Sequence, residues 1–192
     1  MGSLAPTPTM QRRGVVQRTE LWPFSRNVCD ALRGGGEDTT MHHNAAVLQQ
    51  LYSSLDQHHA TAMMDCYHAE ATFHDIAFDL RGKDQIRAMW QMICSGDIRT
   101  AFEVVRVDDR EGVVKLVDEY TFSDTGRRVR NPIESRFRFR DGLIIEHRDC
   151  CDARAWADAA LGGVSGFLAG RLRFLRAWKG RVMLRPFLRA KA

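Results

Sequence analysis

The spacing of apolar side chains predicts three helices in the part of the chain that follows Met41. The first begins near Asn44, the second covers residues 59–67, and the third opens at Gly82, where Asp84 in the first turn is favoured by the helix dipole. Apolar residues three and four positions apart form the buried stripes of the first and third helices. The stripe residues are Val47, Leu48, Leu51, Tyr52 and Leu55 in the first helix, and Ile86, Met89, Trp90 and Ile93 in the third.

The chain between residues 101 and 152 has the period-two alternation of β-strands. A short strand is also expected between the second and third helices, and a last helix follows the strands. Helices that precede an antiparallel meander are typical of the α+β class, in which helices cover one face of a sheet. The predicted strands are 71–75, 101–108, 113–122, 128–139 and 143–152, and the last helix is 153–161.

The loop length of the last hairpin decides which side chains share a face of the sheet. A two-residue loop that ends at Gly142 would place Arg138 opposite Ile145 and mix charged with apolar side chains. A three-residue loop that ends at the same glycine instead pairs Phe137 with Ile145 and leaves the opposite face to ion pairs. We therefore expect the three-residue loop, which also pairs Phe139 with Leu143, Ser135 with His147, Arg136 with Glu146 and Glu134 with Arg148.

The inner face of the predicted sheet is unusually polar. At the preceding turn the same reasoning pairs Asp118 with Ile133 and Tyr120 with Asn131. Helices must cover this face, so its polar groups form either a hydrogen-bonded core or a ligand cavity. The polar side chains on it are Asp118, Tyr120, Asn131, Ser135, His147, Asp149 and Cys151.

Charge is distributed unevenly along the 192 residues, of which 44% are hydrophobic and which carry a formal net charge of +4. Residues 159–192 hold eight basic and no acidic side chains, whereas residues 41–158 are net acidic. The basic excess therefore belongs to a C-terminal tail. The arginines of the predicted outer face alternate with glutamates, which indicates cross-strand ion pairs or a dimer surface and no nucleic-acid partner.

The two ends of the chain differ from the domain, which we expect to cover residues 41–162. Residues 1–40 mix proline and glycine without a hydrophobic period and are expected to be disordered. Residues 163–192 are expected to form a basic amphipathic helix that runs to about Arg185 and is interrupted by Pro186. This helix docks on the acidic surface of the domain or on a second copy, or else it makes a weak peripheral contact with an anionic membrane.

Five cysteines without a C-x-x-C pair favour free thiols in a reducing compartment, so we expect a cytoplasmic protein. The chain has no run of about 18 apolar residues that would span a membrane. Neighbouring histidines such as His42 and His43 project about 100° apart on a helix and cannot easily hold one ion. No metal and no cofactor are therefore expected.

Several short motifs occur in an order that resembles one known family. They are Ala-Thr-Phe-His-Asp at 71–75, Leu-Arg-Gly at 80–82, Met-Trp at 89–90, Phe-Arg-Phe-Arg-Asp-Gly-Leu-Ile at 137–144 and His-Arg-Asp at 147–149. Together they resemble the nuclear transport factor 2-like superfamily, in its SnoaL-like and ketosteroid-isomerase-like branch, over residues 44–162. The resemblance implies a cone-shaped α+β barrel (a cystatin-like roll), in which a curved antiparallel sheet wraps around the N-terminal helices and an apolar pocket lies inside. It also implies a homodimer.

The resemblance makes Asp75 a candidate general base, because the acid of this motif is the base in the isomerase branch. The two oxyanion donors of that branch do not carry over, since their positions fall on Leu51 and Ser135. The loss of each donor would cost about 10² to 10³ in rate, so steroid isomerisation is not expected. The alternative for Asp75 is a structural role, in which its carboxylate caps the loop after the strand.

Three further residues are candidates for acid–base chemistry or for structure. Asp118 and Asp149 either act as an acid and base pair through a water, as in the epoxide-hydrolase members of the superfamily, or form separate hydrogen bonds. His147 is either a proton shuttle or a hydrogen-bonded core residue. The residues expected to line the ligand pocket are Phe73, Trp90, Asp118, Tyr120, Asn131, Ser135 and Phe137.

Two functions remain open from the sequence. The first is that of an isomerase or hydrolase with a pocket for a small apolar molecule, in which Asp75 removes a proton beside a carbonyl group and Tyr120 or Asn131 binds the oxygen. The second is a non-catalytic ligand-binding or dimerisation module on the same fold. A pocket between Phe73, Trp90 and the sheet would favour the first function, and a filled interior the second.

The segment before the domain is predicted to be dispensable, because it has no hydrophobic period. A chain that begins at Met41, which is also a candidate start of the protein, should unfold at the same temperature as the full chain. Scanning calorimetry of both chains checks this. A melting temperature several degrees lower for the shorter chain would show that the segment is part of the folded structure.

Overall fold

The computed structural model describes residues 42–163, 182, 184 and 186–188. The chain divides into two compact units, Met1–Thr39 and Thr40–Ala192, and all described residues belong to the second. The N-terminal segment predicted to be disordered, and most of the predicted tail helix, lie outside the described residues.

Four helices lie within the described residues 42–163, and the starts of three of them follow local sequence signals. The ring of His42 accepts a hydrogen bond from the Asn44 backbone N–H at the start of α1. Gly82, with a φ of +80°, precedes α3, and the Asp152 carboxylate accepts two backbone N–H bonds at the start of α4. The helices are α1 (His43–Asp56), α2 (Ala60–Met64), α3 (Lys83–Cys94) and α4 (Ala153–Leu161).

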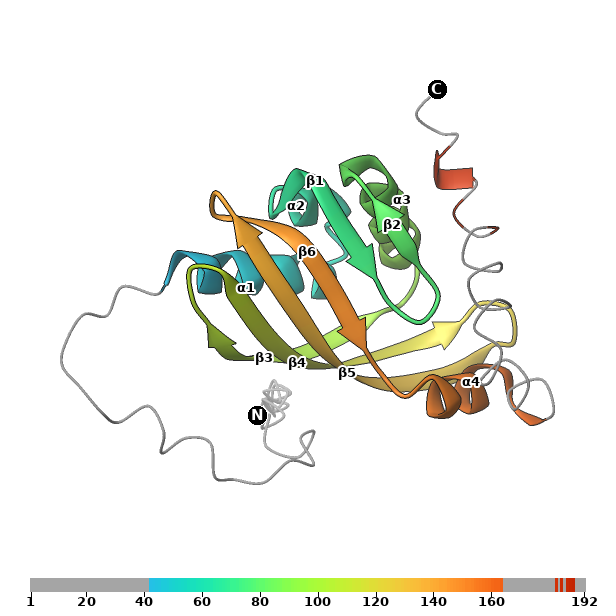
Figure 1. Cartoon of the computed structure of the whole chain (residues 1–192). Coiled ribbons are helices and arrows are strands. Elements are labelled where there is room, and N and C mark those ends of the chain that lie inside the picture. The colour runs from blue at the N-terminus through green and yellow to red at the C-terminus, as the bar shows by residue number, and fades with distance from the viewer. Residues whose placement is uncertain (1–41, 164–181, 183, 185, 189–192) are drawn as a thin grey trace, which may run out of the picture. The chain divides into compact units, whose positions relative to one another are not determined.

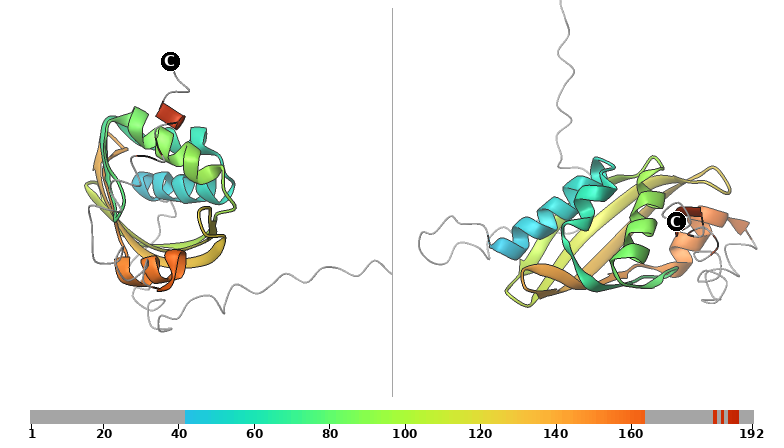
Figure 2. Two further views of the ribbon diagram at one scale, coloured as in Figure 1. Left: turned by 90° about the vertical axis from the view of Figure 1, so that its right-hand side faces the viewer. Right: turned by 90° about the horizontal axis from the view of Figure 1, so that it is seen from above.

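The strands form one six-stranded sheet in the order β2-β1-β6-β5-β4-β3, which curves around α1 and α3 without closing (Figures 1 and 2). The α+β class and the wrapping of a sheet around N-terminal helices are thus confirmed, whereas the sheet is open and not a barrel. The strands are β1 (Tyr67–His74), β2 (Asp79–Arg81), β3 (Arg99–Val107), β4 (Glu111–Phe122), β5 (Arg127–Arg140) and β6 (Leu143–Cys150).

The expectation of a purely antiparallel sheet is wrong at one place, because β1 pairs with β6 in parallel. The short strand β2, which pairs antiparallel with β1, was also not expected. Alternation along a strand indicates which side chains are buried, but it carries no information about the direction of the neighbouring strand. The sequence pattern therefore could not reveal this pairing.

The predicted three-residue loop between β5 and β6 is also wrong. Arg140 pairs with Leu143, and both loop residues, Asp141 and Gly142, have positive φ values of 53° and 72°, as a two-residue hairpin turn of the primed type requires. The register then shifts between Arg138 and Phe139, so that Ile145 is an extra residue on β6. This bulge places Arg138 opposite Glu146 and Phe137 opposite His147, and it removes the mixing of charged and apolar side chains that spoke against the short loop.

The register between β4 and β5 differs from the prediction by two residues. Asp118 lies opposite Asn131 and Tyr120 opposite Val129. A shift of two residues keeps every side chain on the same face. The predicted inner face is therefore retained, although the neighbours on it change.

The main hydrophobic core lies between the helices and the inner face of the sheet. Tyr52 of α1, Phe73 of β1, Met89 of α3 and Ile144 of β6 are among its fully buried side chains. A second, smaller cluster forms where α4 covers the end of the β4–β5 hairpin. It consists of Phe122, Val129 and Ala160, with Tyr120, Trp156, Ala159 and Leu161 packed against it.

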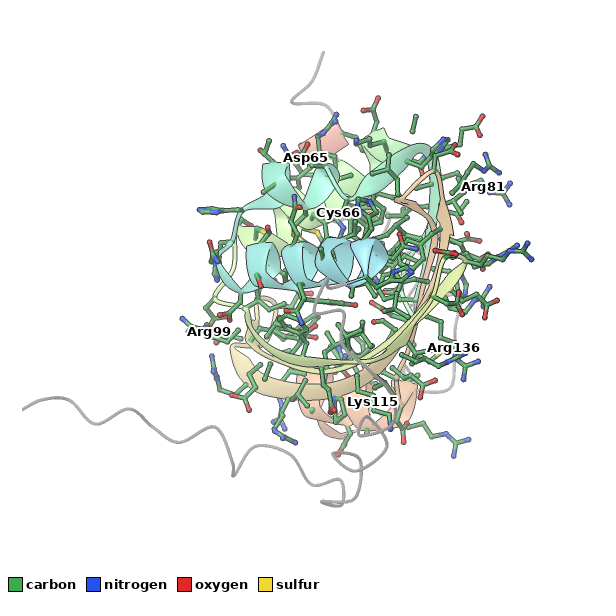
Figure 3. All side chains as sticks on the ribbon, turned by 90° about the vertical axis from the view of Figure 1, so that its left-hand side faces the viewer. Asp65, Cys66, Arg81, Arg99, Lys115 and Arg136 are labelled. Atoms are coloured by element: carbon green, nitrogen blue, oxygen red, sulfur yellow. The ribbon has the colours of Figure 1, made fainter. Side chains whose placement is uncertain are left out.

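The outer face of the sheet is charged. Cross-strand ion pairs join Arg130 to Glu119 at 3.2 Å and Arg138 to Glu146 at 3.6 Å, as the alternation of charges predicted. Figure 3 shows the side chains of Arg81 and Arg136 directed away from the interior. Each exposed pair contributes little to stability, about 0 to 1 kcal/mol.

The C-terminal residues that the structure describes are helical. Leu184 is buried in the main core, and Phe187 packs against it half-buried. Residues 186–188 are helical, but residue 185 lies outside the described residues, so the expectation that Pro186 interrupts the tail helix stays a prediction. The fixed φ of proline is compatible with a helix, and its main cost is the missing N–H donor and the contact with the preceding turn.

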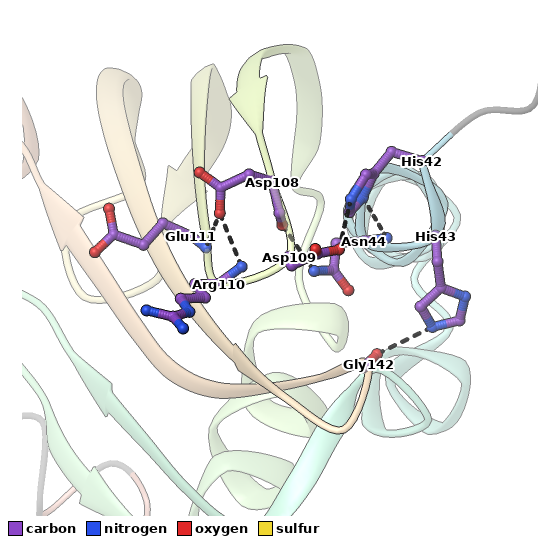
Figure 4. A network of polar contacts seen from close by, with 8 residues as sticks. All are labelled: His42, His43, Asn44, Asp108, Asp109, Arg110, Glu111 and Gly142. Carbon is purple, nitrogen blue, oxygen red and sulfur yellow. Dashed lines mark hydrogen bonds and ion pairs between the residues drawn. The ribbon is translucent and has the colours of Figure 1, made fainter. Parts of the chain in front are cut away.

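Side chains at the start of α1 form polar contacts with two turns of the sheet, the β3–β4 turn and the β5–β6 turn (Figure 4). The Asn44 amide donates to the Asp108 carbonyl oxygen at 2.8 Å, and the His42 ring lies 3.2 Å from an Asp109 carboxylate oxygen. The His43 ring contacts the Gly142 carbonyl oxygen at 3.3 Å. The backbone of Gly142 thus has a positive φ and lies close to the His43 ring.

We predict that Gly142→Ala destabilises the domain more than Gly126→Ala. Both glycines have positive φ, so each substitution costs about 1 kcal/mol from the backbone alone. A Cβ at Gly142 would also lie 2.7 Å from the His43 ring, whereas a Cβ at Gly126 meets nothing within 4 Å. Urea unfolding of both variants measures the difference, and equal losses would show that His43 moves aside without cost.

Candidate functional site

A histidine lies at the centre of the domain, between aromatic rings from two strands and a helix. His147 of β6 is fully buried. Its ring centroid lies 4.8 Å from that of Phe73, 4.3 Å from that of Phe137 and 6.2 Å from that of Trp90. Phe73 and Trp90 also pack edge to face against each other at 5.8 Å. These rings lie in direct contact, so this part of the interior is packed.

One chain of hydrogen bonds runs through the histidine ring. The indole N–H of Trp90 donates to the Tyr67 hydroxyl at 3.2 Å. The Tyr67 hydroxyl lies 2.7 Å from Nδ1 of His147, and Nε2 of His147 lies 2.9 Å from Oδ1 of Asp149. A charged carboxylate can only accept, so Nε2 carries the ring proton that binds Asp149, and the neutral ring then accepts the Tyr67 proton at Nδ1.

A second chain of hydrogen bonds ends on the same carboxylate oxygen. The Tyr52 hydroxyl donates to Ser135 Oγ at 2.7 Å, and Ser135 Oγ donates to Oδ1 of Asp149 in a short hydrogen bond. Oδ1 therefore receives two donors, while no hydrogen bond to Oδ2 occurs within the described residues. Donors that converge on a carboxylate stabilise its charged form. The side chain of Asp149 is 13% exposed, so the network reaches the boundary of the interior.

Asp118 is a second carboxyl group on the inner face, in a different environment. Thr100, which lies opposite on β3, donates to Oδ1 of Asp118 at 2.7 Å. Burial raises the pKa of Asp118 to about 7, and the negative charge of Asp149 adds to this rise, while the bond from Thr100 opposes it. Asp118 can therefore hold a proton near neutral pH.

Further polar groups gather where β1, β4 and β6 end and β5 begins, at the end of the sheet next to α4 (Figure 1). The Trp156 indole N–H donates to the Tyr120 hydroxyl at 2.7 Å. Burial raises the pKa of the Cys151 thiol to about 12, although its hydrogen bond with the Asn131 side chain opposes this. We call Asp75, Asp118, Tyr120, Asn131, Asp149 and Cys151 the polar end of the interior.

Asp75 caps the turn between β1 and β2. Its Oδ1 accepts the backbone N–H of Ala77 at 2.7 Å and that of Phe78. The carboxylate also lies within electrostatic reach of Tyr120 and Cys151, whose pKa values it raises in addition to the larger effect of burial. The capping role that the sequence left open is thus present in the structure.

The predicted site residues fall into two groups. Phe73, Trp90 and Phe137 surround His147, and Ser135 and Asp149 complete that network. Asp118, Tyr120, Asn131 and Asp75 lie at the polar end. The observed register places Asp118 opposite Asn131 and not opposite Ile133 as expected, and it places Asp149 opposite Ser135.

Four residues that take part in these hydrogen bonds were not identified from the sequence. Tyr52 and Tyr67 bind Ser135 and His147, Thr100 binds Asp118, and Trp156 binds Tyr120. The helical stripe indicated that Tyr52 is buried, and a buried tyrosine hydroxyl needs a partner. Which partner it finds depends on the pairing of distant strands.

Two hollows lie on the outer side of the sheet. The larger has a volume of about 510 Å³ and the smaller one of about 340 Å³. Phe73 and His147, whose side chains are buried in the packed interior, also line the larger hollow, whereas Trp90 lines neither hollow. The outward side chains around the larger hollow are Thr72, His74, Asp79, Arg81, Glu146 and Arg148.

In the part of the chain that the structure describes, no three His, Cys, Asp or Glu side chains gather as a metal site. Nor do the described residues include a helix with the length and apolar character needed to cross a membrane.

Residues 48–147 match the family model of the SnoaL-like domain, which is more than half of the chain. The chain belongs to this family. The nuclear transport factor 2-like superfamily and its SnoaL-like branch, expected from the motifs, are thereby confirmed. No curated protein sequence matches the chain.

Solved structures with the same fold come from several bacteria. TsrD from Streptomyces laurentii is 17% identical, with a TM-score of 0.56 over 66% of this chain and 100% of that chain. An epoxide hydrolase from M. tuberculosis is 14% identical, with a TM-score of 0.52 over 66% and 95%. A ketosteroid isomerase-like protein from Catenulispora acidiphila is 13% identical, with a TM-score of 0.53 over 59% and 91%. At these identities the likeness concerns the fold alone.

The raised pKa of Asp118 predicts a loss of stability with rising pH. The unfolded carboxyl ionises near its ordinary value of 3.8, while the folded one remains protonated to about pH 7, so its stabilising effect is complete at low pH and lost as the pH rises through 7. Asp118→Asn keeps the acceptor for Thr100 and cannot ionise. The variant should gain at least about 2 kcal/mol relative to the wild type between about pH 5 and about pH 8.

Chemical denaturation at both pH values measures this difference. Glu119→Gln is the matched control, because Glu119 is the next residue and its side chain is 40% exposed in an ion pair with Arg130. This control should keep the pH dependence of the wild type. Parallel curves for Asp118→Asn and the wild type would mean that Asp118 ionises normally in the folded protein.

Proposed function

We propose that this chain binds a small, uncharged, largely apolar organic molecule at the polar end of its interior and performs acid–base chemistry on it. The observation that carries the proposal is the convergence of two hydrogen-bond chains on Oδ1 of Asp149. Such an arrangement holds a charged carboxylate in a fixed orientation at the edge of an apolar interior. A base with these properties is suited to remove a proton from a bound molecule.

Asp149 is the proposed base. His147 and Ser135 occupy Oδ1, so Oδ2 is the atom that can receive a proton. His147 acts as a positioning residue in this proposal, because both its ring nitrogens are engaged by Tyr67 and Asp149. The role of proton shuttle suggested by the sequence would require one of these two bonds to break.

Asp118 is the proposed proton donor. Burial keeps its carboxyl group protonated to about pH 7, which provides an acid beside a charged base on the same face of the sheet. A carboxyl group that burial keeps protonated near neutral pH is suited to act as a general acid. With a carbonyl substrate, the donor would hydrogen-bond the oxygen while Asp149 takes the proton from the adjacent carbon.

Asp75 remains the alternative base that the family resemblance suggests. Its Oδ1 accepts two backbone N–H bonds, from Ala77 and Phe78, which hold the carboxylate at the turn. These bonds favour its role as the cap of the β1–β2 turn. Separate variants of Asp75 and Asp149 therefore decide between the two assignments.

The charge of the polar end restricts the ligand. Asp75, Asp118 and Asp149 contribute three carboxyl groups within electrostatic reach of Tyr120, Cys151 or one another. An anionic ligand would be repelled by the charged carboxylates of Asp75 and Asp149, while an uncharged ligand can use the apolar rings beside them. This favours neutral molecules with an oxygen atom over carboxylates or phosphates.

A non-catalytic binding module is the second candidate function. It is favoured by the direct packing of Phe73, Trp90 and Phe137 around His147, which occupies the region where a deep pocket was expected. Binding without turnover would then occur only at the half-buried polar end.

The homodimer implied by the family resemblance stays a prediction, for which the charged outer face of the sheet is the proposed surface. Light scattering after size-exclusion chromatography would measure the mass of the particle.

The proposed membrane contact concerns the basic tail, most of which lies outside the described residues.

Deuterium exchange into the ketone α-tetralone tests the proposed chemistry. In heavy water a base removes a proton from the carbon beside the carbonyl group, and a deuteron from solvent replaces it, which NMR of the ketone detects. We expect the protein to accelerate this exchange, and Asp149→Asn to slow the catalysed rate about 100-fold. Asparagine keeps an oxygen acceptor for His147 and Ser135.

Glu146→Gln is the matched control, since Glu146 lies on the same strand but faces outward, where its side chain is 38% exposed. This variant should exchange at the rate of the wild type. Loss of exchange in Asp75→Asn but not in Asp149→Asn would assign the base to Asp75. If the ketone binds without any exchange, the non-catalytic function is correct.

A further inference from the structure

Two tryptophan–tyrosine pairs in this domain have the same donor and acceptor but different surroundings. In the first pair Trp90 of α3 donates to the Tyr67 hydroxyl at 3.2 Å. In the second pair Trp156 of α4 donates to the Tyr120 hydroxyl at 2.7 Å. In both pairs the tyrosine oxygen accepts the indole proton, because an indole nitrogen has no lone pair to offer.

The two pairs differ in what happens to the tyrosine proton. The Tyr67 proton goes to Nδ1 of His147 at 2.7 Å, which completes a closed chain inside the core. The Tyr120 hydroxyl has no acceptor for its proton within the described part of the chain. Because the Trp156 indole N–H occupies one side of the Tyr120 oxygen, the hydroxyl proton of Tyr120 points away from Trp156. Tyr120 is thus a donor held in one orientation at the polar end.

The helix that carries Trp156 is firmly attached to the sheet. Thr125 Oγ1 donates to the Ala160 carbonyl oxygen at 2.6 Å, and Arg127 Nε donates to the Ala159 carbonyl oxygen at 2.7 Å. The Trp156 ring also packs edge to face on Phe122, with centroids 5.7 Å apart. These contacts fix the indole N–H independently of its bond to Tyr120.

The environment of Tyr120 keeps its hydroxyl protonated. Burial raises the pKa of Tyr120 to about 12, and the carboxylates of Asp118 and Asp75 add to this, while the bond from Trp156 opposes it. The charge of Asp75 also disfavours an anion near the hydroxyl. The group that Tyr120 can bind is therefore an uncharged oxygen acceptor.

We propose that Trp156 is a positioning residue that directs the Tyr120 hydroxyl proton toward an uncharged acceptor oxygen of the ligand, such as that of a ketone or an epoxide. This inference rests on the proposed function and narrows it: α4 selects ligands that carry such an oxygen over hydrocarbons of the same shape. Trp156 itself need not touch the ligand.

The test compares two probes that differ only in the oxygen, the ketone α-tetralone and the hydrocarbon tetralin. Dissociation constants are measured by NMR titration of the full chain. The wild type should bind the ketone about 2- to 10-fold more tightly, as one neutral hydrogen bond provides. Tyr120→Phe should lower this preference by the contribution of one hydrogen bond, and Trp156→Phe should lower it by less, while both leave tetralin binding unchanged.

Thr125→Val is the matched control. It removes one attachment of α4 but keeps the indole N–H and the Tyr120 hydroxyl, so it should leave the preference for the ketone intact even if the protein unfolds at a lower temperature. A readout without ligand comes from the Trp156 indole proton, whose NMR signal should move in Tyr120→Phe.

The outcomes separate the two proposals. Equal affinity of the wild type for ketone and hydrocarbon, or an unchanged preference in Tyr120→Phe, would overturn the role of Tyr120 and Trp156 and leave the proposed apolar binding site in place. An indole signal that stays fixed in Tyr120→Phe would also overturn it. Failure of the wild type to bind either probe would contradict the proposed function, and this inference would fall with it.

Discussion

The hydrogen-bonded pair of His147 and Asp149 is the constraint on which the interior depends. A fully buried imidazole needs a partner at each ring nitrogen, and Tyr67 and Asp149 supply them. Tyr52 of α1 and Trp90 of α3 join the same network through Ser135 and Tyr67. One network thus connects two helices with β1, β5 and β6, and a break in it would leave buried polar groups unpaired at about 1 to 3 kcal/mol each.

The proposed chemistry follows from the same network. Its donors all point toward Asp149, which lies between the packed rings and the half-buried polar end. On β4, two strands away from Asp149 in the sheet, burial favours the protonated form of Asp118, and the Tyr120 hydroxyl accepts the Trp156 indole N–H. A charged acceptor, a neutral acid and an oriented donor therefore occur near one another on a single curved face.

The sequence predicted the inner face well, because alternation along a strand is insensitive to errors of register by two residues. His147, Asp149 and Ser135 were assigned to the interior although the predicted pairing was wrong, since the bulge at Ile145 restores the alternation. The partners of these side chains could not be predicted. Tyr67 reaches His147 only because β1 pairs in parallel with β6, and that pairing joins segments about 80 residues apart in the chain.

The position of the proton on the His147 ring tests this account most directly. If the two hydrogen-bond chains run toward Asp149, the proton lies on Nε2 and Nδ1 accepts from Tyr67. Nitrogen NMR of the ring in the unliganded protein distinguishes the two tautomers. We predict a protonated Nε2 and an Nδ1 with the shift of a hydrogen-bond acceptor. A proton on Nδ1 with a lone pair on Nε2 would reverse the chain and contradict the proposed role of Asp149.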